Sequence, residues 1–479
     1  MNEWQRLFFE TQSENAKRIP SCRRYHPDIV RWAIELYSRS PAAYDHLKTT
    51  GVLMLPSCQT LRNYRNLSGT ACGINQLALH QLQGLEREVE AYITVDEMKV
   101  KENLVMKNGR LIGFVDYGDR VTPDKLATHI CMFYVRSFKK ELSIPLSWWP
   151  TTTTPAFQLT SLFWESVIAC EVNGAHINAI VADGSAINRK FFEILHGKPL
   201  SHNDLYSCPN PFRKERIFLC SDTSHLLKTV RNALYSSKPT GTKYLNYKTK
   251  DISWVHLKSL YSMETSSPLH KTKLTNVHMQ LNPFTKMRVG LARDTLSRRV
   301  AYALEDVPGS KGTRDFILLF DKWFDIVTCG VMNPIRSCND ERLIWLENQF
   351  RKYLLDWRNE VDTLHPGEEK RIIAKQTYDG LLFTTTNMVH LTKHLLQHGI
   401  EYVCLKTLTQ DVLEAVFGNL RSNMRRNTNP DVAQVSYSVS AITQRKIIKK
   451  VKGGNTTFGK KNAWTHVCHD PLPKVAKKK

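Results

Sequence analysis

The stretch YITVDEMK (residues 92–99) decides the fold, because its β-rich apolar run ends on a carboxylate, Asp96. The stretch IVADGS (residues 180–185) repeats this arrangement with Asp183. A carboxylate beside buried apolar neighbours is costly unless something compensates its charge. Two strand-end aspartates in one sheet can point at the same spot. The pair therefore predicts a site at the ends of two strands of an α/β sheet.

Other short runs around these two aspartates complete a sheet pattern. Each run is rich in β-forming residues and is bounded by turn-forming or charged residues. The expected strands are 91–95, 111–117, 129–135 and 177–182, with a helix at 157–170 before the last of them. Three strands, a helix and a fourth strand match the opening of a mixed α/β sheet.

A third carboxylate, Glu414, lies in a predicted helix at 409–424. Asp411 and Glu414 are three residues apart and share a helix face. Three converging carboxylates would suit a pair of Mg²⁺ ions, which prefer hard oxygen ligands with open positions for water and phosphate. Taken singly, each acid is explained more simply as a helix cap, a turn residue or a solvated side chain.

The rest of the chain is mainly helical in pattern. Residues 23–67 predict a small helical module of helix-turn-helix type, whose apolar residues suit either plain packing or dimerisation or DNA contact. Residues 223–400 have mostly helical apolar spacing, and this segment is long enough to form a domain of its own. The basic residues after 445 predict a mobile tail.

Composition favours a nucleic-acid partner. The chain has 67 Lys and Arg against 45 Asp and Glu, a formal charge of +22 over 479 residues. This charge suits a polyanion, although a membrane-surface or ribosomal protein would share it. No apolar run is long enough to span a membrane and no secretory signal is recognisable, so an intracellular, soluble chain is expected. Eleven cysteines without a C-x-x-C pair indicate reduced thiols rather than disulfides or a four-cysteine zinc site.

Five blocks together carry a family resemblance. They are TVDEMK (94–99), GFVD (113–116), ADGSAINR (182–189), SDTSHLLKTVRN (221–232) and QDVLE (410–414). In this order they resemble blocks of the P-element transposases and their THAP-domain relatives, over about residues 22–445.

The resemblance implies an α/β fold with a ribonuclease H-like mixed sheet, interrupted by a large, mainly helical GTP-binding-type insertion and preceded by the helical module. It implies that Asp96, Asp183 and Glu414 are the catalytic, Mg²⁺-binding triad. Glu414 would then lie on a helix that returns to the sheet after the insertion. The corresponding boundaries are 1–85 for the module, 86–222 and 401–445 for the two parts of the catalytic domain, 223–400 for the insertion and 446–479 for the tail.

The insertion is also expected to bind GTP. Asp222 would accept hydrogen bonds from the guanine edge and Lys228 would meet phosphate, since an ammonium is a compact phosphate partner. Asp321 and Asp411 are weaker candidates for the same pocket. An alternative for Asp222 is a helix cap, because it precedes a helical pattern.

The leading hypothesis is a DNA transposase of the Asp/Asp/Glu type. It would act in the nucleus with DNA (transposon ends and target) and GTP as partners, two Mg²⁺ ions as cofactors, and self-association. No zinc-ligand pattern of the THAP kind occurs before residue 90, so a copy without that module is expected. The alternatives are a non-catalytic DNA- or chromatin-binding protein that retained the fold and, third, a GTP-responsive assembly factor.

Overall fold

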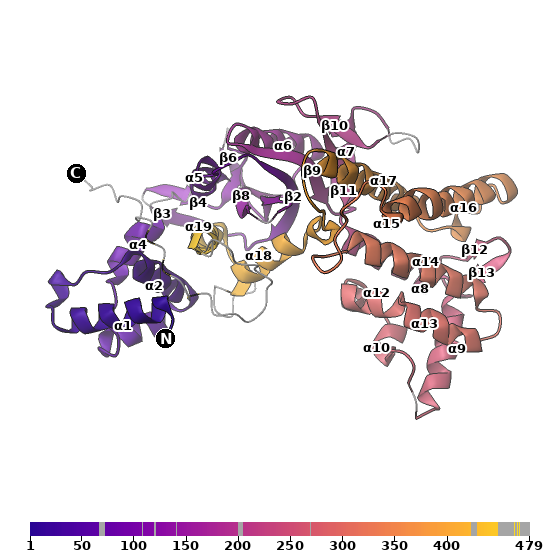
Figure 1. The fold of residues 1–479 in the computed structure, drawn as a ribbon, viewed down its shortest axis with the longest axis horizontal. Helices are drawn as coiled ribbons and strands as arrows, with labels where there is room; N and C mark the ends of the chain where they lie inside the picture. The colour runs from indigo at the N-terminus through magenta and orange to yellow at the C-terminus, as the bar shows by residue number, and fades with distance from the viewer. Residues whose placement is uncertain are drawn as a thin grey trace. The chain divides into compact units, whose positions relative to one another are not determined.

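The computed structural model describes residues 1–479 except 67–71, 108, 119–120, 140, 200–204, 269, 423–428, 449–463, 465–466, 468 and 470–479. The chain forms two compact units (Figure 1). Unit 1 comprises residues 1–89, 95–176 and 411–479, and unit 2 comprises residues 90–94 and 177–410. The basic tail expected from residue 446 falls mostly outside the described residues.

Unit 1 begins with the predicted helical module. Its helices are α1 (Glu3–Ala16), α2 (Pro27–Arg39), α3 (Pro41–Thr49), α4 (Cys58–Asn66) and α5 (Gln76–Gln83). Asn2 and Gln5 close a capping box at the start of α1, which satisfies two backbone N–H groups of its first turn. Buried side chains of α2, α3 and α4, among them Ala33, Tyr44 and Leu61, form one apolar cluster. The apolar spacing of this stretch therefore serves packing.

A seven-stranded mixed sheet forms the centre of the fold. Its strand order is β1 (Gly73–Ile74), β8 (Ser143–Thr151), β7 (His129–Ser137), β2 (Val89–Lys99), β9 (Ala175–Ala182), β11 (Arg216–Ser221) and β10 (Ser207–Pro209). The pairs β1–β8, β7–β8 and β10–β11 are antiparallel, and β9–β11 is parallel. β2 contributes residues to both units.

Helices cover both faces of the unit 1 strands, which explains why the side chains of β7 and β8 are buried almost throughout. On one face, α18 (Asp411–Ser422) and α19 (Val432–Ile448) pack on alternate residues such as Met98, Met132 and Trp148. On the other face lies α6 (Ala156–Glu171), whose Ser166 hydroxyl is 2.9 Å from that of Ser147 on β8.

The run expected as one strand at 111–117 is broken into two. β4 (Arg110–Ile112) pairs with β3 (Val105–Lys107), and β5 (Phe114–Asp116) pairs with β6 (Val121–Leu126). The break is at Gly113, where φ is +135° and an added Cβ would lie 2.0 Å from the Asn103 carbonyl oxygen. Only glycine tolerates both conditions, so the chain turns there.

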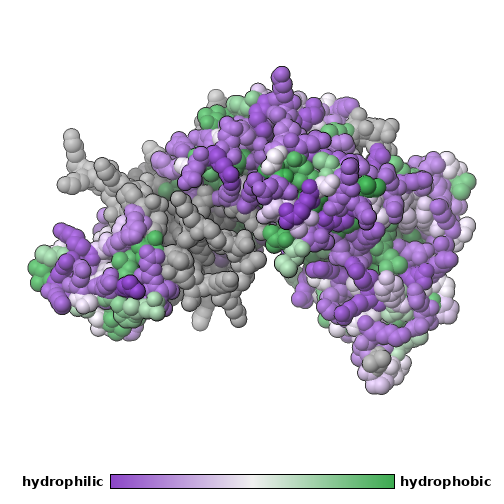
Figure 2. Space-filling view, in the orientation of Figure 1, coloured by the Kyte–Doolittle hydropathy of each residue, from purple (hydrophilic) through white to green (hydrophobic). Residues whose placement is uncertain are grey.

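Unit 2 carries the predicted helical block. After α7 (Ala186–His196), its longer helices are α8 (Thr223–Ser236), α9 (Trp254–Thr265), α14 (Lys311–Val327), α16 (Arg351–Leu364) and α17 (Lys375–Gln397). Shorter elements lie between them: β12 (Leu245–Tyr247), β13 (Lys250–Ile252), α10 (Asn276–Met279), α11 (Pro283–Lys286), α12 (Val289–Thr295), α13 (Arg298–Ala303), α15 (Glu341–Trp345) and the π-helical turn η3 (Leu346–Phe350). Much of the surface seen in Figure 2 is hydrophilic, with small separated apolar patches.

The long helix α17 ties the helical block to the strands of unit 2. The Thr384 hydroxyl accepts a hydrogen bond of 2.9 Å from the Ser221 backbone N–H on β11. The Asn387 amide donates to the carbonyl oxygen of Leu219, also on β11. Gly380 allows α17 to approach α8, because a Cβ there would lie 2.8 Å from Leu226.

The sequence predicts neither a membrane-spanning segment nor disulfides. No helix within the described ranges is long and apolar enough to cross a membrane. None of the cysteines that the structure describes forms a disulfide.

Candidate functional site

Asp96 is half-buried near the C-terminal end of β2. Its carboxylate accepts a hydrogen bond of 2.8 Å from the Glu97 backbone N–H. Side chains two residues apart on a strand share a face, so Asp96 is on the side of Met98, which packs in the cluster with α18. Glu97 instead accepts from the Thr154 N–H at 3.2 Å. Burial, followed by the nearby carboxylate of Glu97, raises the pKa of the Cys131 thiol.

Asp183 is the first residue after β9, and the following loop orients it. Its Oδ1 accepts from the Ser185 N–H at 2.9 Å and from the Asn188 side-chain amide at 2.6 Å. Ser185 caps α7 by accepting from the Asn188 N–H. Arg189 adds a hydrogen bond to the Gly184 carbonyl oxygen. The half-buried carboxylate is thus fixed through one oxygen.

Glu414 is exposed in the first turn of α18. The neighbouring side chains Leu413, Val416 and Phe417 of the same helix are buried in the cluster that contains Met98 of β2. These contacts hold α18 against the sheet face on which Asp96 lies, while Glu414 stays at the surface. The expected return of this helix to the sheet is therefore observed.

The three acids are divided between the two units. Asp96 and Glu414 are in unit 1 on elements that share one apolar cluster, whereas Asp183 is in unit 2 at the end of the strand next to β2. Within the part of the chain that the structure describes, no group of three or more His, Cys, Asp or Glu could hold a metal ion. The ligand chemistry suits Mg²⁺, because all three side chains are carboxylates and the two near strand ends are partly exposed to solvent.

His225 lies beside Asp183, and the sequence argument did not single it out for this position. A Cβ on Gly184 would lie 3.6 Å from the His225 ring. Burial lowers the pKa of His225, the Lys228 charge lowers it further, and the Asp183 charge opposes both. Asp183, His225 and Lys228 therefore share one electrostatic environment within unit 2. The only sequence signal was that His225 follows the helix-capping position of SDTSH.

Asp222 is a helix cap, as the alternative interpretation held. It is only 3% exposed. Its Oδ2 accepts from the His225 backbone N–H at 2.7 Å, and its Oδ1 is 3.3 Å from the Gln410 backbone N–H. Both oxygens thus face backbone donors that fix the start of α8. Lys228 lies farther along the same helix and is also buried.

The two weaker nucleotide candidates lie in different units. Asp321, on α14, pairs through Oδ2 with Arg298 Nε at 2.9 Å. Burial raises the pKa of Asp321, and the Arg298 guanidinium counteracts this rise. α14 packs against α8, which carries Lys228. Asp411 is exposed on α18 in unit 1, whereas the other three nucleotide candidates are in unit 2.

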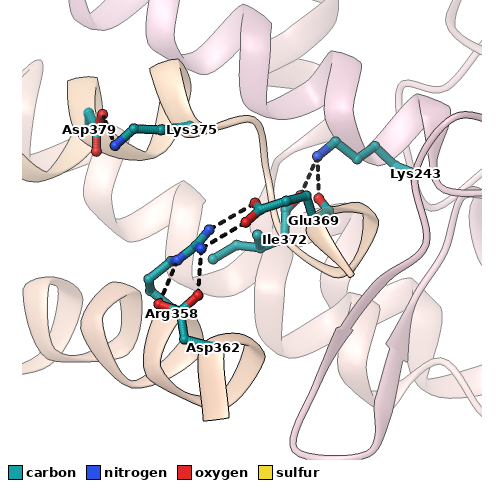
Figure 3. Close-up of polar contacts among 7 residues, drawn as sticks. All are labelled: Lys243, Arg358, Asp362, Glu369, Ile372, Lys375 and Asp379. Carbon is teal, nitrogen blue, oxygen red and sulfur yellow. Dashed lines mark hydrogen bonds and ion pairs between the residues drawn. The ribbon is translucent and has the colours of Figure 1, made fainter. Parts of the chain in front are cut away.

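A cavity of about 540 Å³ in unit 2 holds a network of charges (Figure 3). Arg358 bonds to Asp362, at 2.9 Å from Nε, and to Glu369, at 2.7 and 2.8 Å. Lys375 pairs with Asp379 at 3.2 Å. Arg358 thus joins α16 to the 3₁₀ turn η4 (Glu369–Arg371), whereas Lys375 and Asp379 pair within the first turns of α17.

Comparisons with known proteins agree with this architecture. Residues 70–196 match the model of the TNP-like RNase H N-terminal domain, and residues 224–336 match that of the TNP-like GTP-binding insertion domain. The predicted ribonuclease H-like mixed sheet with a helical GTP-binding-type insertion is confirmed.

One relative and one solved structure cover nearly the whole chain. The transposable element P transposase of Drosophila melanogaster is 24% identical over 454 residues, which are 90% of this chain and 56% of the relative. The chain thus spans about half the length of that curated relative. The structure of the Drosophila P element transposase strand transfer complex superposes with a TM-score of 0.74 at 21% identity, over 92% of this chain and 96% of that chain.

Proposed function

Because this chain belongs to the P-element transposase-like family, we propose that it is the catalytic region of a DNA transposase that cleaves and joins DNA strands. Asp96, Asp183 and Glu414 form its metal-binding triad in this proposal. The reaction needs a nucleophile, first water and then a DNA 3′-hydroxyl, brought in line with a phosphodiester. The partners are transposon-end and target DNA, and the setting is the nucleus, where the protein acts as a homo-oligomer.

One observation carries the proposal. Asp96 lies near the end of β2 and Asp183 directly after β9, and β2 and β9 are neighbours in the sheet. A helix packed on the face that bears Asp96 supplies Glu414. Fold stability alone gives no reason for carboxylates near the ends of two neighbouring central strands.

The three carboxylates would hold Mg²⁺, which when bound supplies activation of the attacking hydroxyl and stabilisation of the leaving oxygen. The protein's own task is to orient the ligands. Asn188 and the Ser185 N–H hold one oxygen of Asp183, and the apolar face of α18 holds the helix of Glu414. A held carboxylate loses less conformational entropy when it binds.

We further propose that the insertion binds GTP, with Lys228 contacting phosphate. Lys228 follows the cap residue Asp222 on α8, and its charge lies close enough to His225 to lower the pKa of that side chain. Asp222 can contact guanine only by sharing oxygens that already face the N–H groups of His225 and Gln410. Asp321 and Asp411 remain secondary candidates for the same ligand.

The test is cleavage of labelled transposon-end DNA by the full chain, with and without Mg²⁺ and GTP. We expect Mg²⁺-dependent nicking that Asp183→Asn abolishes, because an amide does not hold the cation as a carboxylate does. The matched control is Asp315→Asn, which neutralises a half-exposed acid of α14 in an ion pair with Lys250 and should cleave at the wild-type rate. Cleavage by Asp183→Asn at that rate would refute the assignment. Metal-dependent nicking also separates the transposase from a non-catalytic DNA-binding protein.

A further inference from the structure

A second and larger cavity, of about 640 Å³, lies in unit 2 among α8, α9 and the α10–α11 segment. Its lining has two phenols, one ammonium group, three side-chain amides, two apolar residues and no carboxylate. These residues are Tyr235, Lys258, Tyr261, Asn276, Met279, Gln280, Leu281 and Asn282. The set offers ring faces and hydrogen-bond donors to a ligand that carries bases and negative charge.

Positive charge surrounds this cavity. The Lys238 ammonium lies 4.1 Å from the centre of the Tyr235 ring, and the Lys286 ammonium lies 5.6 Å from it. Lys258 is exposed on the wall. Three ammonium groups around a cavity without a lining acid attract phosphate.

A fully buried guanidinium anchors α11, the helix that follows the lining residue Asn282. Arg231 is 0% exposed and donates from Nη2 to the carbonyl oxygens of Thr285 and Lys286, at 3.3 and 3.1 Å. Its Nη1 is buried without a hydrogen-bond partner among the described residues. Burial lowers the pKa of Arg231 to about 10, so it stays charged at neutral pH and adds to the positive potential.

The segment that Arg231 anchors also presents an unusual apolar group. Phe284 is 84% exposed on α11, between the lining residue Asn282 and Lys286. An aromatic ring that stays exposed to water contributes little to the stability of the fold. Aromatic faces beside basic residues are what proteins use to stack successive bases of a single strand while contacting its phosphates.

We infer that this cavity and Phe284 form a binding surface for a single-stranded or unpaired segment of DNA. Phe284 and Tyr261 stack on bases, and Lys258 and Lys286 contact phosphates. Bases inside a duplex are stacked on one another, so their faces are not available to these rings. The surface lies outside the carboxylate triad and the Lys228 site, and its role does not require that either be active.

The test is fluorescence anisotropy with a labelled single-stranded oligonucleotide, the full chain and no Mg²⁺. We expect Phe284→Ala to weaken binding about tenfold, since the variant loses the stacking of one base on an aromatic ring. Its control is Met332→Ala, which removes another exposed apolar side chain of unit 2 (97% exposed) and should bind as wild type. Because Phe284 is exposed, its truncation should leave the melting temperature unchanged.

The charge is tested separately. Lys258→Ala should reduce the slope of log affinity against log salt by about 0.7, the value for one phosphate contact on a single strand. Lys352→Ala, which removes an exposed lysine of α16, is the matched control. Wild-type affinity in both Phe284→Ala and Lys258→Ala would overturn the inference. The inference would also be overturned if these variants bound GTP more weakly but bound the oligonucleotide with wild-type affinity, because the cavity would then hold a free nucleotide.

Discussion

Replacing Asp222 by alanine separates its two assigned roles, and the structure gives the expected size of the effect. The cap to the His225 N–H contributes about 1 kcal/mol. The buried Gln410 N–H would lose its acceptor, which costs about another 1 kcal/mol. Asp222→Ala should therefore lower the free energy of unfolding by about 2 kcal/mol. In a unit as large as unit 2, this corresponds to a melting temperature about 4–8 °C lower.

The assay is thermal unfolding without nucleotide, followed by circular dichroism. Asp222→Asn should lower the free energy of unfolding by half as much as Asp222→Ala or less, because asparagine caps a helix as well as aspartate does but offers only one oxygen. Ser253→Ala is the matched control: Ser253 caps α9 by accepting from the Val255 N–H at 3.2 Å, and its loss should cost about 1 kcal/mol without changing GTP binding. An Asp222→Ala protein that melts with the wild type would refute the capping argument.

Three other outcomes follow from the same structure. Lys228→Met should weaken GTP binding about tenfold in calorimetry while keeping the packing of the buried stem, and unchanged affinity would exclude a phosphate contact. Arg358 lowers the pKa of Glu369, so this ion pair stabilises the fold above pH about 4.5, and its contribution is lost as the pH falls through the folded-state pKa. Arg358→Met should therefore flatten the acid side of a plot of melting temperature against pH. The change should be small, because Glu369 is largely exposed. Duplex DNA binding should weaken by several decades between low and moderate salt if about six to ten phosphates are contacted, and a salt-independent affinity would contradict a phosphate-dominated interface.

Strand-end carboxylates were predictable from sequence because the chemistry is local. The apolar β-rich runs before Asp96 and Asp183 predicted two strands, and both are observed: β9 ends directly before Asp183, whereas β2 continues past Asp96 to Lys99. The helix at 409–424 was expected, and α18 occupies 411–422. In each case the signal lies within ten or so neighbouring residues.

Features that depend on distant partners were missed. β8 was not expected, because Pro145 and Pro150 lie within it and proline removes a ladder donor. β11 was not expected either, since its short apolar run becomes a strand only through pairing with β9 and β10. The pairing of Asp321 with Arg298 is likewise a tertiary contact that no local pattern reveals.

The helix-cap question at Asp222 shows a third limit. Sequence allowed both a cap and a guanine contact, since the same carboxylate suits both. The position of Gln410, far along the chain, supplies the second backbone donor that ties the carboxylate to the fold. Folded geometry, rather than residue type, distinguishes the two roles.

The central claim is that Asp96, Asp183 and Glu414 form one metal-binding unit, and Mn²⁺ binding followed by electron paramagnetic resonance tests it most directly. The full chain, the single variants Asp183→Asn and Glu414→Gln, and their double variant would be titrated without DNA. We expect each single variant to weaken Mn²⁺ binding at least tenfold. The double variant should bind Mn²⁺ little more weakly than either single variant, because the losses of affinity do not add for residues that act as a unit. Wild-type Mn²⁺ binding in both single variants, or losses that multiply in the double variant, would contradict it.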